Sequence, residues 1–314
     1  MASNEIEIPG STVMVGKLKK IAAGRALDRR HFLAALGMTS AAAGAALVGC
    51  STTSSPVAVT TAGSGQTDVL NFILNIKYLQ ATFYAYITTG ADLSSGTTGS
   101  GIITGAPAAK LTFTGTNASQ ITDMLNEIYF DEKNHVTILL NLLGPAAVVR
   151  PAINLAAFAP ITATNALSIA RLLEDVGVTA IAGAAAGLTT SNLTFTSQIL
   201  GTDSFHAGSL RLVSLQNPTI AAYIKADPLD VAPFDPGSAT TAAAGPTGNG
   251  AFFATAGTTS NPLAVPAGFA FFRNPSGAFG SLAVLYGAPG TPAGSGTSSG
   301  GFFPSGVNGV IKTV

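Results

Sequence analysis

Residues 130–144 of the chain read FDEKNHVTILLNLLG, a run in which Glu132 stands three residues before His135. The same spacing recurs further along the chain, where Asp203 stands three residues before His206. Residues three apart share one face of an α-helix, so each pair presents a carboxylate beside an imidazole. Carboxylates neutralise and bridge hard metal ions, and imidazole binds the same metals through a ring nitrogen. The two pairs therefore predict a helical bundle with a metal site in its core.

Glu174 adds a further carboxylate from the middle of another predicted helix. Two acid–histidine pairs and lone acids that all face inward are typical of a dinuclear carboxylate site for iron or manganese. The competing interpretation is that Glu132 and His135 form a surface pair and that His206 is an ordinary core histidine. The spacing alone leaves both interpretations open.

Helical periodicity covers four segments, and the stretches between them indicate how the helices connect. Thr67 is a candidate N-cap and Gly90 a candidate stop for the first helix. The third and fourth helices are separated by a few residues, whereas about twenty residues with three prolines separate the second from the third. This predicts an all-α bundle of two helical hairpins joined by one long crossover. The predicted helices span about 68–89, 119–143, 164–187 and 192–216.

The remaining mature sequence is rich in glycine, threonine and phenylalanine. The loop at 91–116 is long enough to hold a short hairpin at 110–114. We expect residues 218–314 to form an irregular or short-strand extension that packs on the bundle and shields the phenylalanines of the extension from solvent. The runs at 268–272 and 282–286 are either strands or segments that lie against the bundle. With only 10% charged residues and no net charge, the chain offers no basic face for nucleic acid.

The N-terminus reads as an export signal. Arg29 and Arg30 precede an uncharged stretch that ends in Leu-Val-Gly-Cys at Cys50, a pattern typical of a twin-arginine signal followed by a lipobox. We expect cleavage before Cys50 and a lipid on its thiol, which would attach the protein to a membrane of the cell envelope. An uncleaved membrane helix is the alternative. The predicted domains are a signal peptide at 1–49, a tether at 50–66, a bundle at 67–217 and an extension at 218–314.

Several longer stretches carry a family resemblance. DVLNFILNIKYLQATFYAY (68–86), FDEKNHVTILLNLLG, LLEDVGVTAIAGAA (172–185), SFHAGSLR (204–211) and GGFFPSGVNGVI (300–311) resemble bacterial and fungal ferritin-like proteins akin to desiccation-related proteins. The resemblance implies a ferritin-like four-helix bundle and a stress-related role. It also implies that five residues hold the family's metal-ligand positions: Glu132, His135, Glu174, Asp203 and His206.

The first predicted helix departs from the family pattern. Lys77 stands where a glutamate ligand is expected, and Gln80 and Thr82 replace two further acids. An ammonium group cannot ligate a metal and repels a dication. In one hypothesis Lys77 fills the space of a metal and pairs with Glu132 and Glu174, because a buried lysine needs acidic partners. In the other, one iron or manganese ion remains on Glu174, Asp203, His206 and Glu132.

The sequence slightly favours the first hypothesis, in which an ion-pair cluster replaces the metal centre. The second hypothesis keeps one ion, so we expect one metal ion or none. The favoured function is an envelope-anchored protein that is non-catalytic or binds metal weakly. A metal-dependent oxidase or peroxide scavenger and a surface interaction module are the alternatives, and whether the protein is an enzyme stays open. The sequence names no protein partner.

Overall fold

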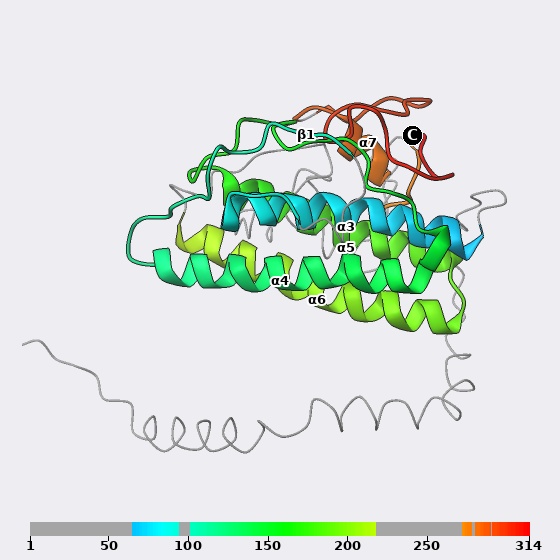
Figure 1. Cartoon of the computed structure of the whole chain (residues 1–314), viewed down its shortest axis with the longest axis horizontal. Helices are drawn as coiled ribbons and strands as arrows, with labels where there is room; N and C mark the ends of the chain where they lie inside the picture. The colour runs from blue at the N-terminus through cyan, green and yellow to red at the C-terminus, as the bar shows by residue number, and fades with distance from the viewer. Residues whose placement is uncertain (1–64, 94–100, 218–271, 278–279, 290) are drawn as a thin grey trace, which may run out of the picture. The chain divides into compact units, whose positions relative to one another are not determined.

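The structure, a computed structural model, describes residues 65–93, 101–217, 272–277, 280–289 and 291–314 (Figure 1). The predicted export signal with Arg29 and Arg30, the lipidation site Cys50, the tether up to residue 64 and residues 218–271 of the extension lie outside these ranges. Within the described ranges, no helix combines the length and the apolar character that crossing a membrane requires.

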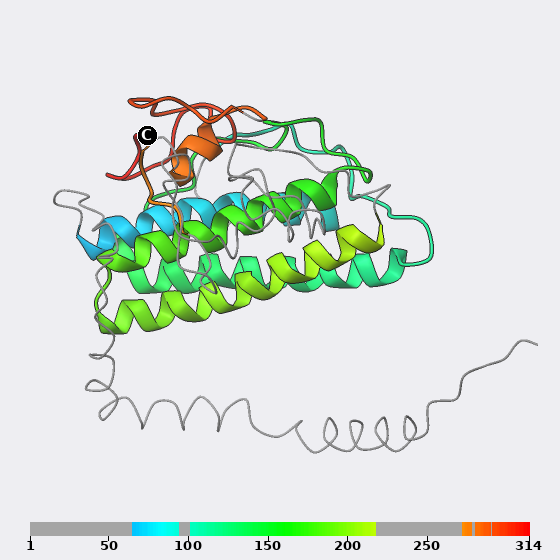
Figure 2. The same cartoon turned by 180° about the vertical axis from the view of Figure 1, so that it is seen from behind.

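Four long helices form a bundle, which confirms the predicted all-α fold (Figures 1 and 2). The helix α3 packs along α4 and α5 packs along α6, while contacts of α3 with α5 and of α4 with α6 close the bundle. The predicted bounds differ from the observed ones by at most three residues. The observed helices are α3 (Gln66–Thr89), α4 (Ala118–Leu143), α5 (Ala166–Ala184) and α6 (Thr190–Gln216).

The ends of α3 follow ordinary capping chemistry. The helix begins after Gly65, whose N–H donates to the Asp68 carboxylate at 3.2 Å, so the predicted cap at Thr67 is wrong. The carboxylate of Asp68, one position after Thr67, accepts the backbone N–H at the start of the helix. Thr67 itself lies inside the first turn. Gly90 ends the helix with φ 76°, a left-handed conformation that glycine adopts without strain, as predicted.

The α3 and α5 side of the bundle is covered, whereas much of α4 and α6 faces solvent. Nearly all residues of α3 and α5 are buried. In both views the loops and the C-terminal segment lie next to these two helices (Figures 1 and 2). Asn71 of α3 donates to the Ala146 carbonyl and accepts the Val148 N–H, each at 2.9 Å. Buried amides therefore tie the covering loops to the bundle.

The two long loops pair with each other. The strands β1 (Ile103–Thr104) and β2 (Ile153–Asn154) run parallel, and they join the α3–α4 loop to the crossover that follows the short turn η2 (Gly144–Ala146). The hairpin predicted at 110–114 is absent from this described stretch. Its Leu111 N–H donates to the Ile87 carbonyl instead, so the segment docks on the end of α3.

The described part of the extension contains a short helix, α7 (Ser281–Tyr286). Of the two interpretations of the run at 282–286, the strand is wrong, whereas the run is buried and contacts α5 of the bundle. A short apolar run buried on all sides carries no periodicity that separates strand from helix. Of the run at 268–272, only residue 272 is described. The Phe302 N–H donates to Leu285 and its carbonyl accepts the Asn154 N–H, both at 2.9 Å, which links the C-terminal segment to α7 and to β2.

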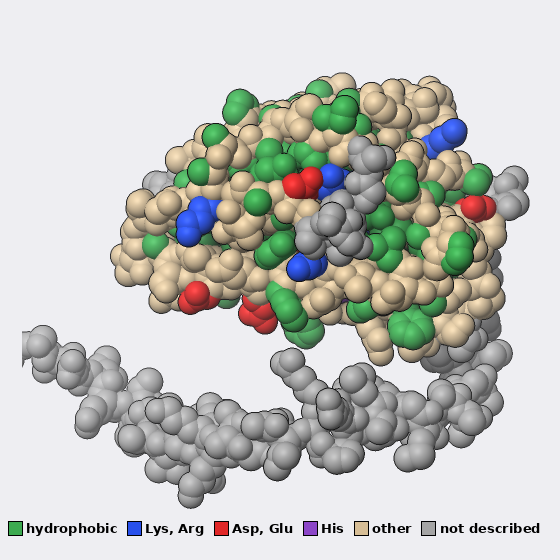
Figure 3. Space-filling model, in the orientation of Figure 1, with side chains coloured by type: hydrophobic (Ala, Val, Ile, Leu, Met, Phe, Trp, Pro, Cys, Tyr) green, Lys and Arg blue, Asp and Glu red, His purple; other side chains and the backbone are tan. Residues whose placement is uncertain are grey.

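The visible surface carries few charges. On the face shown in Figure 3, Lys and Arg side chains are scattered among hydrophobic and neutral groups rather than gathered in one place.

Candidate metal centre

Six polar side chains from all four helices meet inside the bundle, and each residue is at most 6% exposed. Both acid–histidine pairs face inward, which rules out the interpretation of Glu132 and His135 as a surface pair. These six residues form the central cluster: Lys77 of α3, Glu132 and His135 of α4, Glu174 of α5, and Asp203 and His206 of α6.

Lys77 occupies one half of the central cluster. Its Nζ lies 3.0 and 3.1 Å from the two carboxylate oxygens of Glu132 and 2.5 Å from Oδ2 of Asp203. His135 lies on the same side, with Nδ1 3.2 Å from Glu132 Oε1 and 3.5 Å from Asp203 Oδ1. The prediction that Lys77 pairs with Glu132 is confirmed. Its second hydrogen-bonded partner is Asp203, and the predicted pairing with Glu174 is wrong.

The other half of the central cluster contains buried polar atoms that lack hydrogen bonds. Both oxygens of Glu174, Oδ1 of Asp203 and Nδ1 of His206 are buried and make no hydrogen bond with the described residues. His206 Nδ1 lies 3.3 Å from Glu174 Oε2 and 3.5 Å from Glu132 Oε1, which is ion-pair distance without hydrogen-bond geometry. Buried polar atoms are normally hydrogen-bonded, so a group of unsatisfied acceptors indicates a missing ion or water.

This arrangement of helices and ligands agrees with the comparison to known families. Residues 65–216 match the family described as the ferritin-like domain. Their fold is a ferritin-like helical bundle. The match spans all four long helices and every residue of the central cluster. Comparison with curated proteins and with solved structures gave no significant match.

The ion pairs set the electrostatics of the ferritin-like domain's core. Burial by itself would lower the pKa of Lys77, but the carboxylates of Asp203, Glu132 and Glu174 outweigh burial and raise that pKa. Burial would raise the pKa of Glu132, but the Lys77 ammonium holds it well below its usual range. Burial and the two neighbouring glutamates raise the pKa of Asp203 despite the ammonium beside it. Lys77 is therefore a fixed positive charge at neutral pH.

His206 is also protonated when no metal is present. Burial would lower the pKa of this imidazole, but Glu132 and Glu174 raise it to about 11. Its second nitrogen, Nε2, lies 3.2 Å from Oδ2 of Asp131, whose side chain is 32% exposed. The imidazole therefore bridges the buried carboxylates and a carboxylate at the surface.

A dinuclear metal site does not fit this set of residues. The Lys77 ammonium sits between Glu132 and Asp203, two carboxylates that a pair of metals would need, and it would repel an adjacent dication. Lys77 on α3 therefore removes one expected metal ligand. Its ammonium also blocks the position of a second metal by its size and its charge.

A single divalent ion does fit. Four side chains can each offer one ligand atom, with all four atoms within 4.8 Å of one another: Glu132, Glu174, Asp203 and His206. The single charge of Lys77 and the double charge of a divalent ion together balance three carboxylates. His135 is outside this group and contacts the carboxylates on the Lys77 side.

Asp131 is not among the site residues predicted from the sequence, although its carboxylate contacts His206. Asp131 precedes Glu132, so its neighbour faces the core while its own side chain reaches the rim beside His206. An acid next to an acid–histidine pair is a weak signal, because contact with a histidine on another helix depends on how the two helices pack. A carboxylate that accepts from one imidazole nitrogen orients the ring for ligation through the other.

Gln80 and Thr82, which stand where two further acids are expected, form hydrogen bonds with groups outside the central cluster. Gln80 donates to the Leu173 carbonyl of α5 at 3.2 Å, and Thr82 accepts from Arg150 at 3.4 Å. Both residues therefore contact neighbouring backbone and loop groups. Of the three replacements in α3, Lys77 alone enters the central cluster.

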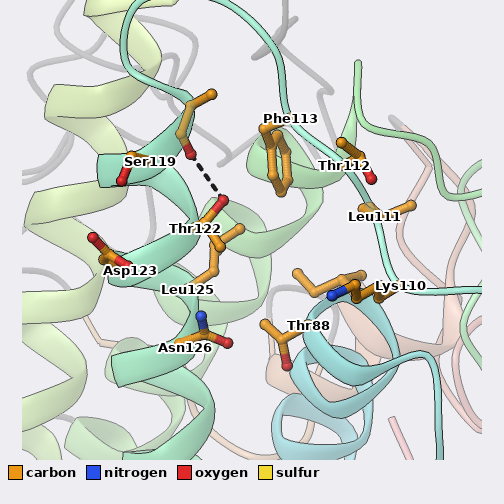
Figure 4. Close-up of a pocket in the computed structure, with 12 residues that line it drawn as sticks. Thr88, Lys110, Leu111, Thr112, Phe113, Ser119, Thr122, Asp123, Leu125 and Asn126 are labelled. Atoms are coloured by element: carbon orange, nitrogen blue, oxygen red, sulfur yellow. Dashed lines mark hydrogen bonds between the residues drawn. The ribbon is translucent and has the colours of Figure 1, made fainter.

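A separate pocket of about 470 Å³ lies between the end of α3, residues 110–113 and the beginning of α4 (Figure 4). Lys110, Phe113, Thr122 and Asn126 are among its lining residues, and no residue of the central cluster lines it. The Thr122 hydroxyl already donates to the Ala118 carbonyl at 2.8 Å. The pocket therefore contributes nothing to the candidate metal centre.

Proposed function

We propose that this protein is a single-metal ferritin-like protein attached to the cell envelope, in which Lys77 replaces the second metal of a dinuclear centre. The observation that carries the proposal is the group of buried carboxylate oxygens of Glu174 and Asp203 that make no hydrogen bond with the described residues, next to His206 and beside a fully paired Lys77. This corresponds to the second of the two hypotheses drawn from the sequence, and the structure favours it over a metal-free ion-pair cluster.

The proposed metal is iron or manganese, which suits a site rich in carboxylates with one imidazole. Such an ion would act as a local positive charge and, if it is iron, as a one-electron redox centre. The protein's own residues hold the carboxylates in place through Lys77 and keep the centre buried. A two-metal oxidation needs a second ion where the ammonium lies, so we propose a binding role rather than a dinuclear oxidase.

Affinity in this site is expected to be modest. A metal that binds His206 must displace the proton from an imidazole whose pKa lies near 11. It must also share Glu132 and Asp203 with the ammonium of Lys77. Both effects weaken binding relative to a site whose carboxylates are free.

Attachment to the envelope rests on the sequence alone. The paired arginines and the lipobox ending at Cys50 support export and lipidation, and the resemblance to desiccation-related proteins supports a stress-related role. The unsatisfied acceptors in the core support the metal site independently of these features.

Thermal unfolding with and without Mn²⁺ tests the metal site. We expect Mn²⁺ to raise the Tm of the wild-type chain, because an ion that binds only the folded state stabilises it. Glu174→Gln should abolish this rise, because it removes the carboxylate whose two oxygens make no hydrogen bond with the described residues. Glu127→Gln is the matched control, since it makes the same change at an exposed position of α4. A Tm of Glu174→Gln that responds to Mn²⁺ as the wild type does would refute the proposed site.

A further inference from the structure

The solvent side of α6 carries no charge. Between Ser191 and Gln216 the charged or titratable residues are Asp203, His206 and Arg211, and all three are buried. Every described side chain that α6 exposes is neutral or apolar. A surface helix of a soluble domain normally places charged residues on its outer face, so this helix departs from the usual pattern.

Large apolar side chains stand on the same side. Phe205 is 78% exposed, Leu212 is 53% exposed and Phe195 is 45% exposed. Single exposed hydrophobic residues are common, but several on one uncharged helix face indicate a surface that binds something.

Among the described residues, no neighbour explains why two positions on this side are glycine. Gly201 and Gly208 lie inside α6 and are exposed, and a Cβ at either position would meet nothing within 4 Å. Glycine inside a helix is unfavourable relative to alanine, and neither residue has a positive φ that would require it. Their small size is explained if a backbone or side chain from another molecule approaches closely.

The spacing of these residues makes the face complementary to itself. Gly201, Phe205, Gly208 and Leu212 follow one another at steps of four, three and four, so they share one face of the helix. A large side chain thus alternates with a notch along α6. In an antiparallel pair of such helices, Phe205 of each copy can enter a glycine notch of the other.

We propose that this face, the α6 face, is the contact surface between two copies of the chain arranged about a two-fold axis. The lack of charge favours a second copy of the chain as the partner, because two uncharged faces leave no unpaired charge when they are buried against each other. Its 27 residues give a helix about 40 Å long, whose solvent-facing half offers about 600 Å². Two copies would bury about 1,200 Å², which is the lower end of the range for stable complexes.

Sedimentation equilibrium of the full chain carrying Cys50→Ser, so that no lipid is attached, tests this proposal. We expect a mass of twice the chain mass. Gly208→Arg should weaken the dimer at least about ten-fold, because a large charged group would fill the notch. The single copy should fold as before, since that Cβ meets no neighbour. Circular dichroism and thermal unfolding check that the variant is folded.

Gly294→Arg is the matched control. Gly294 is also exposed with open space around its Cβ, but it lies in the C-terminal segment, so this variant should remain dimeric. Gly201→Arg provides a second variant on the α6 face and should act like Gly208→Arg. A monomeric parent chain at sub-millimolar concentration would overturn the proposal, whether or not that monomer binds lipid vesicles. Retention of the dimer in folded Gly208→Arg and Gly201→Arg would overturn it as well.

Discussion

At the scale of single residues, Lys77 determines the chemistry of the core. The buried ammonium of Lys77 is hydrogen-bonded to Glu132 and Asp203, so each group compensates the buried charge of the other. Removal of one member leaves buried charge without compensation, which costs more than the pair contributes when intact. The residue therefore has both a structural role and a role in limiting metal occupancy.

Lys77→Met should destabilise the metal-free protein by about 3–5 kcal/mol, because Glu132 and Asp203 lose the ammonium that compensates them. Denaturant unfolding in the presence of a chelator measures this change. Lys133→Met, on α4 outside the central cluster, is the control and should change stability by less than about 0.5 kcal/mol. Equal stabilities of the two variants would show that Lys77 does not compensate the carboxylates.

Binding of Mn²⁺ should strengthen as pH rises from about 6 to 8, by up to about ten-fold per pH unit, because a proton on His206 competes with the metal. The pKa of this imidazole is raised to about 11, so the protonated form dominates throughout this range and each binding event releases the proton. Calorimetric titration in buffers of different ionisation enthalpy measures both affinity and proton release. Binding that is independent of pH and releases no proton would exclude His206 as a ligand.

At the scale of elements, a close contact between α5 and the segment around Arg273 determines how this part of the bundle is covered. A Cβ on Gly183 would overlap the backbone carbonyl of Arg273, whose N–H donates to the Thr179 carbonyl at 2.9 Å. Backbone cannot move aside as a flexible side chain can. Position 183 therefore requires glycine because the backbone of Arg273 lies so close to it, and not because of an unusual φ.

Gly183→Ala should destabilise the protein by about 1–3 kcal/mol, because the added methyl group forces the Arg273 segment away from α5. Ala182→Ser, at the adjacent half-exposed position, is the control and should have little effect. Thermal unfolding compares the two variants. If Gly183→Ala were as stable as the control, the contact between α5 and the Arg273 segment would not be as close as described.

The helices could be predicted from sequence because each long element carries its own periodicity and stop signals, such as Gly90 after α3. The run at 282–286, for which a strand was one of two interpretations, is a helix, because so short an apolar run lacks a period that separates the two structures. The loop pairing of β1 with β2 joins segments about fifty residues apart, which no local pattern encodes.

The candidate site was predictable to a similar degree. Helix spacing identified the residues that meet in the core, because i and i+3 positions must share a face. It could not identify Asp203 as the second partner of Lys77, or Asp131 as the outer partner of His206. Both contacts depend on the rotation and depth of α6 against its neighbours, which are properties of packing between helices.

At the scale of the whole molecule, the sequence predicts that one covalent attachment sets the location of the protein. Cys50→Ser should release the chain from membranes, because it removes the thiol that carries the lipid. Arg29→Lys combined with Arg30→Lys should instead block export. Fractionation of cells into soluble and membrane parts distinguishes these outcomes. If Cys50→Ser stayed in the membrane fraction, the uncleaved-helix alternative would be favoured over lipidation.

The most direct test is the amount of Mn²⁺ bound to the wild-type chain and to Lys77→Glu at equilibrium dialysis against saturating Mn²⁺. Mass spectrometry of the metal measures this amount. We expect one ion per wild-type chain on the side of Glu174, because Lys77 occupies the other half of the central cluster. We expect two ions in Lys77→Glu, because the substitution replaces a repelling ammonium with a carboxylate ligand. Two ions in the wild type, or none in either protein, would contradict the account.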